Sequence, residues 1–187
     1  MTEIRVQNLC KTYGDHVVLR NLSFTAGVGV TRILGRSGAG KTTLLRILLG
    51  LDQPDSGSLF GTNCRWAAVF QEDRLLGHLD AEDNLRFALG SAYNAAAAKT
   101  LLGKLGLADV GSKPICEYSG GMKRRLALAR ALLAPSDALT LDEPFTGLDE
   151  ENRSIALRCI LHAAQTKPVL LASHEALDLP NCKEVRL

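Results

Sequence analysis

Short apolar runs alternate along this chain with longer segments in which apolar residues recur at helical spacing. The short runs predict buried strands at residues 30–34, 67–70, 138–141 and 169–172. The longer segments predict helices at about 41–49, 122–134 and 155–164, and more than one helix between about 80 and 107. Strands separated by helices favour a mainly parallel sheet with helices on its faces, so the fold class is α/β.

Each predicted strand is followed by a glycine or by polar residues. In parallel sheets of this kind, ligands bind at the carboxyl ends of the strands. We therefore expect a site where the residues that follow the strands meet, and these residues are Gly35, Gln71, Asp142, Glu143 and His174.

The composition is that of a globular domain, with 46% hydrophobic and 22% charged residues in a length of 187. The 22 basic and 20 acidic residues nearly balance, which argues against a strongly basic nucleic-acid surface. No apolar run reaches the length of a membrane span, and no signal-peptide-like stretch opens the sequence. The five scattered cysteines favour reduced thiols over a disulfide framework or a metal site.

A glycine-rich segment between a predicted strand and a predicted helix carries the most specific chemistry. Residues 35–42 fit the pattern G-x-x-x-x-G-K-[ST], in which backbone N–H groups and the helix N-terminus hold phosphates. Lys41 can reach the terminal phosphates, and the Thr42 hydroxyl can ligate Mg²⁺. The predicted nucleotide-binding residues of this segment are Gly35, Ser37, Gly38, Gly40, Lys41, Thr42 and Thr43.

Two acidic residues follow the strand predicted at 138–141. Asp142 should emerge at the sheet edge, where a carboxylate can hold Mg²⁺ directly or through water. Pro144 favours an extended Glu143, whose carboxylate could then activate a water in line with the terminal phosphate. A polar turn after a strand is the alternative when this segment is taken alone.

A second candidate anion site lies at residues 119–121, before the helix predicted at 122–134. Ser119 suits the N-cap position, and the N–H groups at a helix start can bind an anion. For an isolated Ser-Gly-Gly, simple capping is the favoured explanation. The order of the motifs decides between the two.

Over nearly its whole length, the chain resembles the ATP-binding subunits of ABC transporters. Residues 35–43 resemble the Walker A loop, Gln71 the Q-loop glutamine, and residues 118–122 the signature usually written LSGGQ. Residues 139–143 resemble Walker B with the catalytic glutamate, residues 147–149 the D-loop, and His174 the switch histidine. The resemblance implies a P-loop NTPase fold with a small antiparallel β-subdomain and an α-helical subdomain at about 72–118, all within one domain at 1–187.

The same resemblance implies an ATPase that works as a head-to-tail dimer with ATP and Mg²⁺. Each ATP would lie between Lys41 of one subunit and Ser119, Gly120 and Gly121 of the other. Gln71 would contact Mg²⁺ and the attacking water, Glu143 would be the general base, and His174 would contact the terminal phosphate. Tyr13 corresponds by position to the aromatic residue that stacks on adenine, a contact worth about 1–3 kcal/mol.

The sequence departs from the family pattern at three places. Tyr118 and Met122 replace the usual Leu and Gln around Ser-Gly-Gly. The stretch between Lys41 and Gln71 is short, which predicts a trimmed antiparallel β-subdomain there. The chain ends soon after His174, so we expect no C-terminal regulatory domain and a loss of the last core strands.

The resemblance also implies partners and a location. The partners are a second ATP-binding subunit in a homodimer, a membrane-spanning permease and a substrate-binding protein, and no nucleic acid is expected. The location is the cytoplasmic face of the cell membrane. Residues 70–76 resemble the Q-loop region of importer ATPases of the nitrate, sulfonate, taurine and thiamine-precursor group.

Two other classes of function stay open at this point. One is a soluble ABC-type ATPase that acts in protein or cofactor assembly. The other is a degenerate subunit without catalysis, and the intact residues Lys41, Asp142, Glu143 and His174 argue against it. Members that organise or repair DNA carry a long coiled-coil insertion, for which residues 72–118 leave no room. The cargo belongs to other subunits, so this sequence does not specify it.

Overall fold

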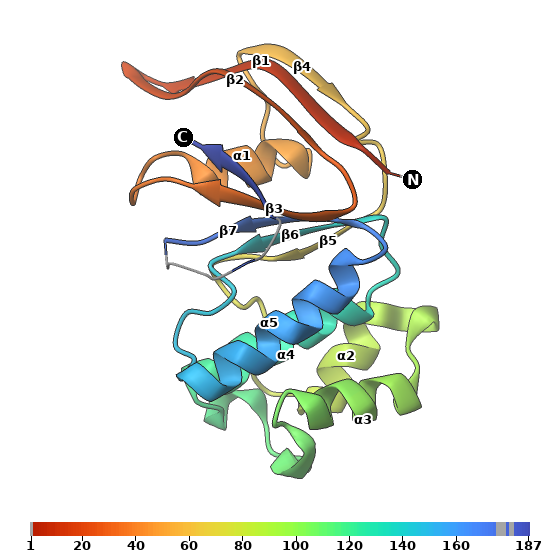
Figure 1. Cartoon of the computed structure of the whole chain (residues 1–187). Helices are drawn as coiled ribbons and strands as arrows, with labels where there is room; N and C mark the ends of the chain where they lie inside the picture. The colour runs from red at the N-terminus through yellow and green to blue at the C-terminus, as the bar shows by residue number, and fades with distance from the viewer. Residues whose placement is uncertain (1, 175–178, 180–181) are drawn as a thin grey trace.

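A computed structural model describes residues 2–174, 179 and 182–187 of the chain. Two sheets and a group of helices make up the molecule (Figure 1). The larger sheet has five parallel strands in the order β5-β6-β7-β3-β8. In chain order these strands are β3 (Gly29–Leu34), β5 (Trp66–Val69), β6 (Ala138–Asp142), β7 (Pro168–Ala172) and β8 (Lys183–Arg186).

The smaller sheet is antiparallel, with three strands in the order β2-β1-β4. These strands are β1 (Ile4–Tyr13), β2 (His16–Ala26) and β4 (Ser56–Phe60). The resemblance predicted such a subdomain but placed it between Lys41 and Gln71, and that position was wrong for most of it. Two of the strands precede residue 27, where alternating buried residues such as Ile4 and Val6 face the core.

The five-stranded sheet is covered on both faces (Figure 1). On one face lie α1 (Lys41–Leu48) and the antiparallel sheet, and on the other lie α4 (Gly120–Leu133) and α5 (Glu150–Ala164). β7 shows the two-sided burial directly, because Val169 and Leu171 join the core with α4 and α5 while Leu170 joins the core with α1. A strand buried on both faces reads as a continuous apolar run, which explains the sequence pattern.

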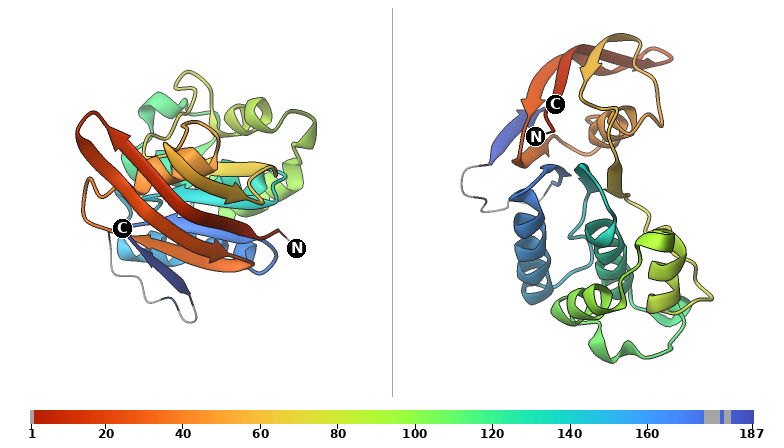
Figure 2. Two further views of the ribbon diagram at one scale, coloured as in Figure 1. Left: turned by 90° about the horizontal axis from the view of Figure 1, so that it is seen from above. Right: turned by 90° about the vertical axis from the view of Figure 1, so that its right-hand side faces the viewer.

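The remaining helices form a separate layer beyond α4, at the bottom of Figure 1 and of the right panel of Figure 2. They pack around a third core that includes Leu85, Leu107, Ile115 and Leu126. In the part of the chain that the structure describes, these helices are α2 (Ala81–Leu89), α3 (Ala95–Lys104) and the short 3₁₀ helices Gly90–Ala92, Ala108–Val110 and Ile115–Glu117. This layer occupies the range predicted for the helical subdomain.

Two helices begin earlier than the sequence predicted, and one strand was not expected. α4 begins at Gly120, and α5 begins at Glu150 rather than at 155, because the Asp149 carboxylate caps it through the N–H of Asn152. β8 follows His174 and pairs with β3, so the predicted loss of the last core strands was wrong for this strand. The antiparallel sheet lies across α1, as the left panel of Figure 2 shows.

Candidate functional site

A cavity of about 250 Å³ opens at the carboxyl edge of the five-stranded sheet. Most of the residues that the sequence analysis selected at the strand ends meet in its walls. Its lining consists of Tyr13, Val18, Ser37, Gly38, Gly40, Lys41, Thr42, Thr43, Gln71, Asp142 and Glu143.

The glycine-rich loop connects β3 to α1 along one wall of the cavity. Gly40 has φ 97°, in the left-handed region, and an added Cβ would lie 2.5 Å from a methyl carbon of Val18. A larger residue could not make this turn. α1 has no acidic residue in its first turn and no side-chain N-cap, so its first N–H groups are available to an anion.

The Lys41 ammonium lies within this loop and is almost completely buried. Its Nζ donates to the carbonyl oxygens of Gly35 at 2.9 Å and Arg36 at 3.3 Å. Oε1 of Glu143 lies 3.8 Å from the same Nζ. A cation held at this point can attract the phosphates of a nucleotide.

Thr42 and Asp142 form an oxygen pair on the cavity wall. The Thr42 hydroxyl donates to Oδ2 of Asp142 at 2.6 Å. Burial raises the pKa of Asp142, and the hydrogen bond from Thr42 opposes that rise. Mg²⁺ prefers such oxygen ligands and usually keeps several waters and phosphate oxygens, so this pair fits it. The described residues contain no group of three or more His, Cys, Asp or Glu side chains that could hold a metal ion. Mg²⁺ at this pair would therefore need waters and phosphate oxygens as its other ligands.

Glu143 is held from two sides. Its Oε2 lies 2.9 Å from Nδ1 of His174 and 3.3 Å from the His174 backbone N–H, which donates to it. Glu143 has φ 49°, so the extended conformation predicted from Pro144 was wrong. The turn is held by the Glu143 N–H, which donates to the Ala172 carbonyl at 2.9 Å. Such a left-handed non-glycine residue stores backbone strain and is typical of functional sites.

Arg124 is a functional candidate that the sequence analysis missed. It lies on α4, and its side chain is buried. It donates to the carbonyls of Phe70 and Gln71, both at 2.6 Å, and lies 3.2 Å from Asp73. Its guanidinium therefore fixes the backbone of the Gln71 segment while the Gln71 side chain is exposed at the cavity. A buried arginine in a helix has no signature in a single sequence.

Ser119, Gly120 and Gly121 do not line the cavity. Ser119 caps α4, because its hydroxyl accepts the Met122 N–H at 3.2 Å. An added Cβ at Gly121 would lie 2.7 Å from the Gly147 carbonyl oxygen, so the segment is packed against Gly147 and Leu148. The side chain of Ser119 is exposed, which leaves it accessible to another molecule.

Tyr13 lies at the outer end of the cavity with 47% of its surface exposed. Its hydroxyl donates to Asp52, and this hydrogen bond raises the pKa of Tyr13. Lys11 lies 5.0 Å from the ring centroid. A ring held at its hydroxyl end and exposed beside the phosphate loop is suited to stacking on a base.

The fold and this cavity define a P-loop nucleotide-binding domain. A sequence model described as "ABC transporter" matches residues 19–146, and the chain belongs to this family as an ATP-binding domain. "Aliphatic sulfonates import ATP-binding protein SsuB" of Corynebacterium glutamicum is 38% identical over 92% of this chain and 74% of its own length. "Nod factor export ATP-binding protein I" of Cupriavidus metallidurans is also 38% identical, over 91% of this chain. The chain spans 62% of that relative's length.

Solved structures show the same fold at lower sequence identity. A putative ABC transporter ATP-binding protein from Pyrococcus furiosus aligns with a TM-score of 0.87 and 24% identity, covering 98% of this chain and 97% of its own. A bacterial Atm1-family ABC exporter aligns with a TM-score of 0.85 and 22% identity over all of this chain and 38% of its own. None of the described helices is both long enough and apolar enough to cross a bilayer.

Proposed function

We propose that this chain is the ATP-hydrolysing subunit of an ABC transporter. The observation that carries the proposal is the meeting of Lys41, Thr42, Asp142 and Glu143 in one cavity, with His174 bonded to Glu143. A phosphate cradle, an oxygen pair for Mg²⁺ and a positioned carboxylate are the parts that phosphoryl transfer to water requires.

ATP would place its phosphates at the first turn of α1 and beside Lys41, with its adenine toward Tyr13. Mg²⁺ would be held by the Thr42 hydroxyl and by Asp142, directly or through water, and would neutralise charge on the terminal phosphates. Thr43 and the glycines at 35, 38 and 40 complete the cradle with Ser37. The hydrogen bond at 2.6 Å between Thr42 and Asp142 supports this assignment, because it brings two oxygen ligands to one point.

Glu143 would accept the proton of the attacking water. Its Oε2 is held by His174 and its Oε1 lies beside Lys41, so the carboxylate has one fixed orientation. Because a carboxylate can only accept, Nδ1 of His174 carries the proton of their hydrogen bond, and a second proton on Nε2 would let the ring donate to a phosphate oxygen as well. Gln71, exposed at the cavity wall, would contact the water and Mg²⁺.

The active site would be completed by a second copy of the chain. At about 250 Å³ the cavity is smaller than the 300–1,000 Å³ typical of sites that enclose a whole ligand. Ser119, Gly120 and Gly121 are outside this cavity, and Ser119 is exposed at the N-terminus of α4. A head-to-tail homodimer would bring this helix start onto the ATP bound at Lys41 of the other subunit.

A groove of about 510 Å³ between the core and the helical layer is the candidate dock for the permease. Leu51, Trp66, Phe70 and Leu89 are among its lining residues, and Leu51 is half exposed. Phe87, on the neighbouring α2, is 75% exposed. Two large exposed apolar side chains, Leu51 and Phe87, beside a groove with partly buried apolar walls are typical of a protein interface. Docking there would hold the chain on the inner face of the membrane, next to the Gln71 segment.

We assign the direction of transport as import, with a substrate-binding protein as a further partner. The support is the likeness of residues 70–76 to importer ATPases and the similarity to a sulfonate importer subunit. Export is the alternative, because a Nod factor export protein is equally similar. A soluble ATPase for protein or cofactor assembly is the other candidate. Co-purification with a multi-span permease favours transport, and uptake measured in cells that lack this subunit gives the direction.

Mixing two inactive variants tests the two-chain ATPase. Lys41→Ala should lose tight ATP binding, and Ser119→Arg should bind ATP without hydrolysing it, so each alone should be inactive in phosphate release. A mixed dimer has one site with both Lys41 and Ser119 intact. We therefore expect the mixture to recover hydrolysis.

Two outcomes would contradict the proposal. Hydrolysis by Ser119→Arg alone at the normal rate would show that one chain forms the complete site. Unchanged ATP affinity in Lys41→Ala would remove the phosphate cradle. Lys99→Ala, an exposed lysine on α3, is the matched control and should keep both binding and turnover.

A further inference from the structure

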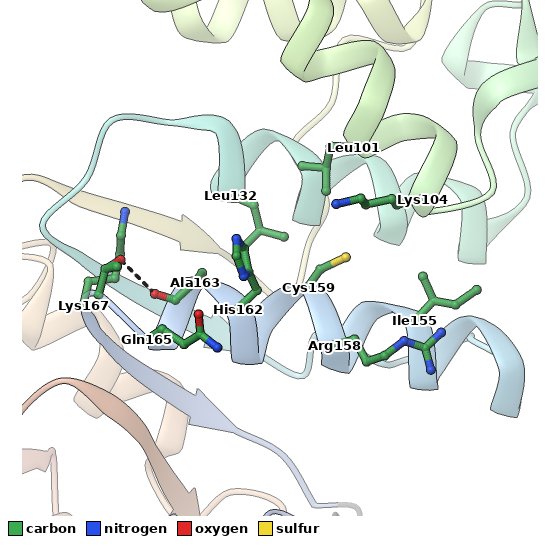
Figure 3. Close-up of a pocket in the computed structure, with 11 residues that line it drawn as sticks. Leu101, Lys104, Leu132, Ile155, Arg158, Cys159, His162, Ala163, Gln165 and Lys167 are labelled. Atoms are coloured by element: carbon green, nitrogen blue, oxygen red, sulfur yellow. Dashed lines mark hydrogen bonds between the residues drawn. The ribbon is translucent and has the colours of Figure 1, made fainter.

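A second cavity, of about 790 Å³, lies between α3, α4 and α5 on the face opposite α1 (Figure 3). It shares no lining residue with the nucleotide cavity. Its volume is within the range of small-molecule sites. Nothing in the proposed ATPase cycle uses it, so it needs an explanation of its own.

The inner wall of the cavity is apolar. Leu101 comes from α3, Leu132 from α4, and Ile155 and Ala163 from α5 (Figure 3). All four pack against the main core and are only partly buried. A hydrocarbon or ring placed on them would remove exposed apolar surface from water, worth about 25 cal/mol per Å².

The polar side of the cavity carries one sign of charge. Its charged residues are Lys104, Arg158 and Lys167, joined by His162, and no acidic side chain lines it. Lys167 is already engaged, since its ammonium donates to the carbonyl and hydroxyl oxygens of Ser136 at 2.7 and 3.1 Å. Among the described residues, Lys104, Arg158 and His162 have no hydrogen bond or ion pair with another side chain.

Lys104 and Arg158 lie on either side of Cys159, with their charged groups apart from each other (Figure 3). Cys159 lies between them on α5, and Figure 3 shows its sulfur directed toward the Lys104 ammonium. Burial raises the pKa of the Cys159 thiol, while Lys104 and Arg158 both act to lower it. Both cations therefore act on the Cys159 thiol, which lies next to the apolar wall.

We propose that this cavity binds a small amphipathic anion, an organic acid with an apolar body. The body would lie on Leu101, Leu132 and Ile155, and the exposed side chains of Lys104 and Arg158 would turn toward the anionic group. Charge-assisted hydrogen bonds of this kind are the strong ones, and arginine can make two to one carboxylate. A cationic ligand would meet only like charge, and a polar anion would leave the apolar wall exposed.

Octanoate is a suitable probe, and the Cys159 thiol reports on it. Iodoacetamide labelling of the full chain, followed by peptide mass spectrometry, measures the reaction at each cysteine. We expect millimolar octanoate to slow labelling of Cys159 and to leave the exposed Cys116 unchanged. Octyl glucoside, with the same apolar chain and no charge, should protect Cys159 much less.

Charge-reversed variants then identify the residues. Lys104→Glu and Arg158→Glu should each weaken octanoate binding roughly 10-fold, the change expected from one charge-assisted contact. Lys99→Glu is the control, because it makes the same change on α3 outside the cavity. Broadening of the octanoate proton resonances measures binding directly, and it replaces the thiol assay if Cys159 reacts too slowly.

Three outcomes would overturn the proposal. Equal protection by octyl glucoside would make the cavity a plain apolar groove. If Lys99→Glu weakened octanoate binding as much as Lys104→Glu does, the change in affinity would come from net charge and not from a contact in the cavity. Protection by phosphatidylglycerol vesicles without any by octanoate would assign the surface to a membrane. The proposal does not depend on the ATPase, because ATP is not needed in any of these measurements.

Discussion

Nδ1 of His174 lies 2.9 Å from Oε2 of Glu143, which joins the end of β7 to the end of β6. The two residues are 31 positions apart in the chain and meet because their strands are neighbours in the sheet. The backbone N–H of His174 donates to the same carboxylate oxygen. A carboxylate held by two donors keeps its free oxygen in one place, which is what a general base requires.

Glu143→Gln should keep ATP binding and lose most turnover. The amide has nearly the same shape as the carboxylate but cannot accept the proton of the attacking water. We expect phosphate release to fall about 10²- to 10⁴-fold, with accumulation of an ATP-bound dimer. Turnover is measured by phosphate release and the dimer by light scattering after gel filtration.

Glu150→Gln is the control for this substitution, since Glu150 is an exposed acid in the first turn of α5. It should leave turnover near normal. If Glu143→Gln hydrolysed ATP at close to the normal rate, Glu143 would not be the base, and the search would move to a water held by Gln71 and His174.

Arg124→Lys should destabilise the domain and slow hydrolysis together. Arg124 bonds two carbonyls at 2.6 Å and pairs with Asp73, and a lysine ammonium cannot replace that fork. We expect a loss of about 1–3 kcal/mol in the free energy of unfolding, or roughly 2–12 °C in Tm. Lys123→Gln, one residue away, should change neither Tm nor turnover much. An unchanged Tm in Arg124→Lys would contradict the anchoring role.

Gly121→Ala and Gly120→Ala should differ although they are neighbours. An alanine Cβ at Gly121 would lie 2.7 Å from the Gly147 carbonyl, while nothing lies within 4 Å of one at Gly120. Backbone would have to move in the first case, at a cost of about 1–3 kcal/mol. Urea unfolding of both variants measures the difference. Equal stabilities would mean that the two loops separate freely.

Asp137→Asn should change how stability depends on pH. Oδ1 of Asp137 accepts a hydrogen bond from the Arg65 guanidinium at 2.9 Å, and Oδ2 accepts from the Nε and the backbone N–H of Arg65. These bonds lower the pKa of Asp137 to about 2. A lowered folded-state pKa stabilises the fold at pH values above the unfolded pKa of about 3.9. That contribution disappears as the pH falls toward 2.

The measurement is Tm between pH 2 and pH 7 for both proteins. The Tm of the natural protein should exceed that of Asp137→Asn above about pH 4, and the gap should close below it. Asp15→Asn, an exposed residue in the turn between β1 and β2, should show no such gap. A gap that stays constant down to pH 2 would show that the pair does not titrate as described.

The sequence by itself determined the α/β class, the phosphate loop and the strand ends that carry Gln71, Asp142, Glu143 and His174. These were predictable because the information is local. A strand buried on both faces needs a continuous apolar run, and a phosphate loop needs glycine and lysine at fixed spacing. The resemblance to ABC proteins added the antiparallel sheet, which no local pattern in the chain had predicted, and it grouped the helices predicted at about 80–107 into a separate subdomain.

Only the tertiary structure decided which distant residues meet. The antiparallel sheet is built mostly from residues 4–26. Glu143 has a left-handed backbone, although Pro144 favoured an extended one. Arg124 is buried and bonded to the Gln71 carbonyl. The tertiary structure also gathered Lys104, Arg158 and the apolar wall into one cavity. The physical reason is that these contacts join segments many residues apart, whose pairing depends on strand order and helix packing rather than on neighbouring residues.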